Sequence, residues 1–70
     1  MSGILTFDTT HHALFAEEIA RENGIGAEII PAPSDSRAKC DLALEFMLAE
    51  KELLLSLLTS QDVAFIVHRG

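Results

Sequence analysis

The chain has 70 residues, of which 49% are hydrophobic and 23% charged, and its formal net charge at pH 7 is −6. This length fits one folded domain, residues 1–70, whose small core leaves no room for a deep, enclosed substrate cavity. The acidic balance argues against binding to nucleic acid or to an anionic membrane, because both require a basic face on the protein.

The first half of the chain reads as strand, helix, strand. Residues 4–7 form a short apolar segment that predicts a strand, and the next residues, Asp8-Thr9-Thr10, are of the types that cap helices. Residues 10–23 predict a helix with apolar side chains gathered on one side. Gly24 tolerates the left-handed conformation that ends a helix, and residues 25–31 then predict a second strand.

The second half repeats this order after a loop that contains prolines. Leu42, Leu44 and Phe46 alternate with other residues, which predicts a half-buried third strand. Residues 49–60 predict a leucine-rich second helix, and residues 63–67 predict a fourth strand. The order βαββαβ is that of the ferredoxin-like α+β arrangement, so we expect a four-stranded antiparallel sheet with two helices on one face.

This topology brings distant segments to one edge of the sheet. Right-handed crossovers make the first two strands parallel, and the third strand runs antiparallel between them. The third strand therefore starts at the edge where the first helix also starts. We expect Cys40 to lie there, near the residues that open that helix, Thr9, Thr10, His11 and His12.

Cys40 is the only cysteine of the chain, and it is either a small core residue or a reactive thiol. Arg37 and Lys39 lie within three positions of it, and nearby cations favour the thiolate, which is the reactive form. The partial positive charge at the start of the first helix acts in the same direction, as would a protonated histidine. Asp41 acts against them, because it is an anion next to the sulfur.

The His11-His12 pair is a weak basis for a metal site. Adjacent helical residues point about 100° apart, so the two rings are poorly placed to meet one ion. Zinc needs about three or four protein ligands, and Asp8 or Asp41 would have to supply the rest. We therefore expect no metal, and we assign one histidine to hydrogen bonding or proton transfer.

The face of the sheet that is turned away from the helices could associate with a partner. The positions expected on this open face are Ala43, Glu45, Glu28, Ile30, Ala64 and Ile66. A partly apolar open face often marks a partner or self-association surface. A simple semi-exposed sheet shows the same pattern, and the residues alone do not separate the two.

The residues also resemble a known family of small proteins, the selenium/sulfur carrier protein-like family. The resemblance covers nearly the whole chain and rests on ILTFDTTHHAL at 4–14, Glu17, Pro31-Ala32-Pro33, Cys40, Leu42-Ala43-Leu44 and the segment 63–69. It implies a small α+β domain whose key cysteine handles sulfur or selenium as a persulfide or selenopersulfide. The family's usual Cys-Gly reads Cys40-Asp41 here.

The expected function is a carrier or adaptor rather than an autonomous enzyme. Cys40 is the expected acceptor thiol, with His11 or His12 as its proton or hydrogen-bond partner. The expected binding residues are Thr9, Thr10, Arg37, Lys39 and Asp41. No cofactor is required beyond a transient sulfur or selenium atom, and the expected partners are sulfur or selenium donor and acceptor proteins.

Two further expectations concern location and the alternative function. The chain has no apolar segment that reads as a signal peptide or a membrane span, so we expect a cytoplasmic protein. The alternative function is a non-catalytic binding or regulatory module, which docks a partner or small ligand through the open face of the sheet. The open face could also form a homodimer.

Overall fold

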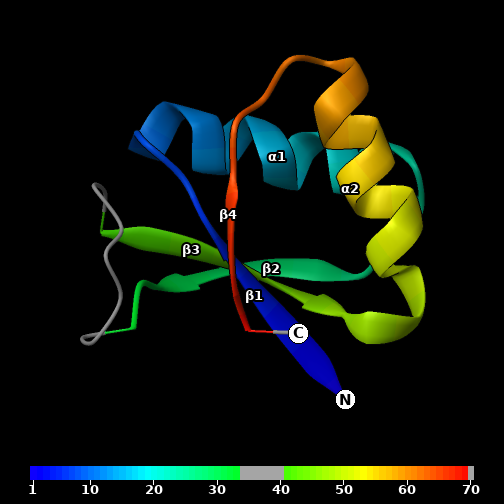
Figure 1. Cartoon of the computed structure of the whole chain (residues 1–70), viewed down its shortest axis with the longest axis horizontal. Coiled ribbons are helices and arrows are strands. Elements are labelled where there is room, and N and C mark those ends of the chain that lie inside the picture. The colour runs from blue at the N-terminus through cyan, green and yellow to red at the C-terminus, as the bar shows by residue number, and fades with distance from the viewer. Residues whose placement is uncertain (34–40, 70) are drawn as a thin grey trace.

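The computed structural model describes residues 1–33 and 41–69, in which the elements follow the predicted order βαββαβ (Figure 1). The strands are β1 (Ser2–Thr6), β2 (Ala27–Pro31), β3 (Leu42–Met47) and β4 (Ile66–Arg69). The helices are α1 (Thr10–Glu22) and α2 (Lys51–Ser60), and a short 3-10 helix, η1 (Leu48–Glu50), precedes α2. Neither α1 nor α2 is long and apolar enough to cross a bilayer, within the part of the chain that is described.

The four strands form one sheet in the order β2-β3-β1-β4, and every neighbouring pair is antiparallel. β3 lies between β1 and β2, so those two strands are parallel to each other, as the crossover rule requires. Ala43 is paired with Thr6 of β1 on one side and with Ile30 of β2 on the other. This arrangement confirms the ferredoxin-like α+β fold.

The hydrophobic core lies between one face of the sheet and both helices, which Figure 1 shows on the same side of the strands. The strands contribute Leu5, Leu44 and Phe46, all at most 1% exposed. The helices contribute Ala13, Ala16, Ile19, Ala20, Leu54 and Leu58. Small alanines on α1 let that helix approach the sheet closely, while the fully buried leucines of α2 fill the remaining volume.

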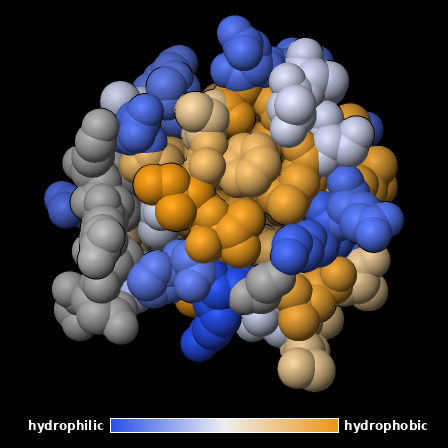
Figure 2. Space-filling view, viewed as in Figure 1, coloured by the Kyte–Doolittle hydropathy of each residue, from blue (hydrophilic) through white to orange (hydrophobic). Residues whose placement is uncertain are grey.

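β4 is one of the two edge strands of the sheet, and it is less well covered than its neighbour β1. Val67 is paired with the core residue Leu5, yet its side chain remains 40% exposed. Phe65, which precedes the strand, is half-buried against the core. Figure 2 accordingly shows hydrophobic side chains at the surface in the region where β4 passes the viewer.

Helix α1 ends in a Schellman motif. Gly24 has a φ of +71°, its N–H donates to the Arg21 carbonyl at 3.2 Å, and the Ile25 N–H donates to the Ala20 carbonyl at 2.9 Å. The motif places Ile25 in the core at 4% exposure. The second strand therefore begins at Ala27 rather than at the predicted residue 25, because Ile25 belongs to the helix cap.

Helix α2 also ends in a Schellman motif, and this motif explains why the fourth strand begins later than predicted. Asp62 has a φ of 61°, its N–H donates to the Thr59 carbonyl at 3.0 Å, and the Val63 N–H donates to the Leu58 carbonyl at 2.9 Å. Val63 is buried at 5% exposure as the apolar residue of this cap. The fourth strand, predicted at residues 63–67, accordingly spans Ile66–Arg69.

The two caps differ in the residue at the left-handed position, and this difference predicts a change in stability. Asp62→Gly should raise the free energy of unfolding by about 0.5–1 kcal/mol, because glycine has no steric penalty there and a carboxylate is unfavourable at a helix C-terminus. Gly24→Ala should lower it by about 1 kcal/mol for the converse reason. Urea unfolding followed by circular dichroism measures both changes, and a destabilised Asp62→Gly variant would contradict this account of the cap.

Replacing Gly3 of β1 should lower the stability by more than replacing Gly24 does. A Cβ atom at Gly3 would lie 2.6 Å from Phe46 Cζ and 2.7 Å from the Arg69 carbonyl oxygen, so β1 needs a glycine here for both to approach. Gly3→Ala should lower the free energy of unfolding by about 1–3 kcal/mol in the same urea assay. Gly26→Ala is the matched control, since its nearest contact is 4.0 Å away. Equal stabilities for the two variants would show that the close approach is unimportant.

Candidate functional site

The first turn of α1 forms one side of the candidate site, and Thr9 determines where that turn begins. Thr9 has an extended backbone, with φ −140° and ψ 157°, and its side-chain oxygen accepts a hydrogen bond from the His12 N–H at 3.1 Å. Its carbonyl accepts from the Ala13 N–H at 3.2 Å. Thr9 is thus the N-cap, Thr10 is the first helical residue as predicted, and the rings of His11 and His12 are held on the first helical turn.

The two histidines occupy different environments. His11 is exposed and His12 is half-buried; their ring centroids are 6.3 Å apart, and the ring planes are tilted by 52°. The Nδ1 atom of His12 is buried and has no hydrogen-bond partner among the residues that the structure describes. A buried ring nitrogen without a partner is unfavourable. His12 is therefore the histidine whose ring has a nitrogen without a hydrogen-bond partner among the described residues.

Asp41 lies at the same edge of the sheet as the start of α1. It directly precedes β3, and its carbonyl accepts a hydrogen bond from the Ala32 N–H at 2.8 Å, which continues the pairing between β2 and β3 by one step. Because Thr6 at the end of β1 is paired with Ala43 near the start of β3, the chain leaves β1 and enters β3 at one edge. The side chain of Asp41 is exposed there.

Three predicted site residues, Arg37, Lys39 and Cys40, lie outside the described residues, so their place beside α1 stays a prediction. Among the residues that are described, no group of three or more His, Cys, Asp or Glu side chains could hold a metal ion. The described part of this edge therefore consists of the Thr9 cap, the exposed Thr10 and His11, the half-buried His12 and the exposed Asp41.

The register of the strands defines two rows of side chains on the open face of the sheet. One row consists of Ile30, Ala43, Thr6 and Ile66, and the other of Glu28, Glu45, Ile4 and Arg69. Arg69 joins the second row because the pairing of β1 with β4 has a register shift between Ile4 and Leu5. Five of the six residues predicted on this face are in these rows. Ala64 is not, because it belongs to the connection before β4.

On the open face of the sheet, the side chains of the central strands are buried and those of the edge strands are more exposed. Ile4, Thr6 and Ala43 on the two central strands are at most 5% exposed, so Ala43 points away from the core and is nevertheless buried. On the edge strands, Ile66 is 52% exposed, and Glu28 is also exposed. Contacts across this face therefore depend on the side chains at its margins.

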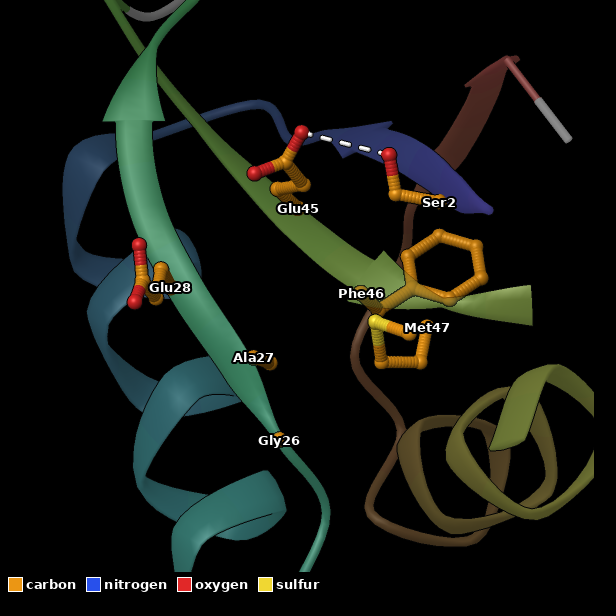
Figure 3. Close-up of a pocket in the computed structure, with 7 residues that line it drawn as sticks. All are labelled: Ser2, Gly26, Ala27, Glu28, Glu45, Phe46 and Met47. Carbon is orange, nitrogen blue, oxygen red and sulfur yellow. Dashed lines mark hydrogen bonds between the residues drawn. The ribbon is translucent and has the colours of Figure 1, made fainter. Parts of the chain in front are cut away.

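A pocket of about 420 Å³ opens on this face, at the end of the sheet remote from α1's first turn (Figure 3). It is lined by Ser2, Gly26, Ala27, Glu28, Glu45, Phe46 and Met47. Glu28 and Glu45 are directly opposite each other on neighbouring strands, an arrangement of like charges that is unfavourable without a cation. The Ser2 hydroxyl donates to Glu45 Oε2 at 3.3 Å. The sequence pattern assigned both glutamates to this face, but only the register shows that they form a pair.

Comparison with known proteins adds one finding to this geometry. A family model described as "Putative Se/S carrier protein-like" matches residues 2–66, a range that includes the α1 cap, both histidines and Asp41. No curated protein and no solved structure matches the chain. With its fold and nearly its whole length matched to one model, this chain belongs to the Se/S carrier protein-like family.

Proposed function

We propose that the chain carries sulfur or selenium as a transient adduct on Cys40 and passes it between a donor protein and an acceptor protein. The observation that carries the proposal is membership of the Se/S carrier protein-like family over residues 2–66, in a chain with one cysteine. A carrier needs a nucleophilic atom and two partners, and it does not need an enclosed pocket. A domain of this size with an exposed edge meets those requirements.

The transfer that we propose is a nucleophilic exchange without net oxidation. The Cys40 thiolate attacks the outer sulfur of a persulfide on the donor, so a new S–S bond forms and the donor thiolate leaves with the electron pair. The outer sulfur then resides on Cys40 as a persulfide. An acceptor nucleophile attacks that same sulfur, and Cys40 leaves as the thiolate that began the cycle. With a selenopersulfide donor, selenium is transferred in the same way.

His12 is the proposed proton or hydrogen-bond partner of this sulfur. One observation supports its choice over His11: the Nδ1 atom of His12 is buried without a partner among the described residues. The helix that carries it starts at the sheet edge that Asp41 also occupies. Asp41 is the next residue after Cys40 in the sequence. A persulfide or an incoming thiol at this edge would satisfy the ring nitrogen.

The charges around Cys40 act in opposite directions on the anion. Arg37 and Lys39 are its cationic neighbours in the sequence, and the positive end of the α1 dipole favours an anion near the Thr9 cap. Asp41 opposes them, because its carboxylate follows the sulfur directly in the chain. We therefore expect a thiol that reacts with persulfides and that is not permanently ionised.

The carrier role predicts a covalent adduct that mass spectrometry can detect. After incubation with a cysteine desulfurase and cysteine, the intact chain should gain about 32 Da, the mass of one sulfur atom, and reduction should remove that gain. Cys40→Ser should show no gain under the same conditions. A wild-type chain that stays unmodified, or a Cys40→Ser chain that gains the same mass, would contradict the proposal.

The role of His12 predicts a difference between two neighbouring substitutions. His12→Ala should slow the loading of Cys40 by at least about tenfold, while His11→Ala should change it by less than about twofold. The measurement is the rate of adduct formation at one pH and equal protein concentration. His12→Asn, whose side chain keeps a hydrogen-bonding group near the Nδ1 position, should recover part of the rate.

Comparable loading rates for His11→Ala and His12→Ala would overturn this assignment. We expect His12→Ala to remain folded, because the substitution removes a buried nitrogen that has no partner in the described chain. Circular dichroism of each variant confirms that the fold is kept.

A second candidate function is a binding module without covalent chemistry, and the pocket on the open face favours it. The pocket presents two carboxylates that a cationic group on a partner would bind. In that case Cys40→Ser would retain full partner binding and cellular function. The carrier proposal requires that the same substitution abolish transfer.

A further inference from the structure

We propose that the open face of the sheet binds a second copy of this chain, face to face, about a two-fold axis that runs parallel to the strands between β1 and β3. The proposal does not depend on the carrier role. It rests on the two rows of side chains on the open face and on the way in which their charges and apolar groups are distributed across the sheet.

The charged row is polarised from one edge of the sheet to the other. It runs from Glu28 on β2 and Glu45 on β3, across the buried Ile4, to Arg69 on β4. Both acids are therefore on one half of the face, and the arginine is on the other half. Such a row is complementary to itself when a second copy is turned so that β4 lies over β2.

Two copies can stack face to face about a two-fold axis that is either parallel or perpendicular to the strands, and the charges favour one of these orientations. With the axis parallel to the strands, each row meets its own copy in reverse order, so Arg69 lies over Glu28 of the second copy. With the axis perpendicular to the strands, β2 lies over β2 and β4 over β4, so the charged row meets either its own like charges or the apolar row. Juxtaposed like charges are costly in an interface, so the parallel axis is the favoured one.

The pocket on the open face gives Arg69 of the second copy a place to bind. Figure 3 shows Glu28 and Glu45 on adjacent strands at this pocket, with Ser2 donating to Glu45. The two carboxylates are directly opposite each other, so their repulsion is relieved when a cation lies between them. A guanidinium fits this requirement, because its planar fork can donate to two carboxylates.

The apolar row supplies the second part of the contact. The same axis places Ile66 on β4 over Ile30 on β2 of the second copy. Ile66 is 52% exposed, Ile30 is half-buried, and both occur twice in the assembly. Isologous contacts of this kind close a dimer without leaving a free face for further growth.

The size of the face indicates a modest affinity. Four strands spaced by about 4.8 Å, with about five residues each, cover only about 320 Å², and the side chains on the two central strands of this face are already buried. A standard interface buries about 800 Å² on each partner, and the whole chain exposes 4312 Å². We therefore expect a weak dimer that forms in the millimolar range, because its contacts are limited to the margins of the face. Its axis keeps the start of α1 in both copies at the same end of the assembly.

Charge reversal in separate chains tests the proposal. Sedimentation velocity over a concentration series that extends into the millimolar range should show a monomer–dimer equilibrium for the wild-type chain. Glu28→Lys alone and Arg69→Glu alone should each weaken the dimer by at least about tenfold, because each places like charges opposite each other. An equimolar mixture of the two variants should form a heterodimer with wild-type affinity, since one contact is then native and the other is reversed.

Two control chains make the outcome specific. Glu22→Lys makes the same charge change on α1, in the other layer of the fold, and should dimerise as the wild-type chain does. The double variant Glu28→Lys/Arg69→Glu should dimerise with itself, which excludes misfolding as the cause of the single-variant losses. A wild-type chain that remains monomeric throughout, or a mixture that fails to associate, would overturn the proposal.

Discussion

The antiparallel register between β1 and β3 is the constraint on which the rest of the structure depends. Pairing Thr6 with Ala43 and Leu5 with Leu44 sets which side chains enter the core and which face outward. A shift of one residue would exchange the two faces and bury Glu45 in place of Leu44 and Phe46. Gly3 fixes the far end of this register, because only a residue without a side chain admits the Phe46 ring and the β4 backbone together.

The same register separates the two surfaces on which the proposals rest. The edge where β1 ends and β3 begins holds the Thr9 cap, the buried ring nitrogen of His12 and the exposed Asp41. The open face holds the paired glutamates, Arg69 and the exposed Ile66. Among the described residues, the proposed transfer site and the proposed self-association surface therefore share no side chain.

The order of elements could be predicted from the sequence because the periodicity of apolar residues agrees with the residues that start and end helices. The starts of β2 and β4 could not, because Ile25 and Val63 are apolar residues that close helix caps, and periodicity does not distinguish them from strand residues. The burial of Ala43 on the open face was also beyond sequence reasoning. Alternation assigns Ala43 to the outward face, but it does not predict that this residue is 0% exposed.

The convergence of the α1 start and Asp41 at one edge could be predicted from topology alone, since a third strand antiparallel to the first begins where the first strand ends. The distinction between His11 and His12 could not be predicted. The two are neighbours of identical chemistry, and only tertiary packing decides that one ring is exposed and the other has a buried nitrogen.

The most direct test of this account follows the histidine ring resonances by NMR while Cys40 is loaded with sulfur. The account predicts that the His12 ring shifts strongly, that His11 shifts less, and that His68 in β4, toward the far end of the sheet, stays unchanged. Unchanged His12 resonances, or a shift of His68 as large as that of His12, would contradict the claim that the chemistry occurs at the edge where α1 begins.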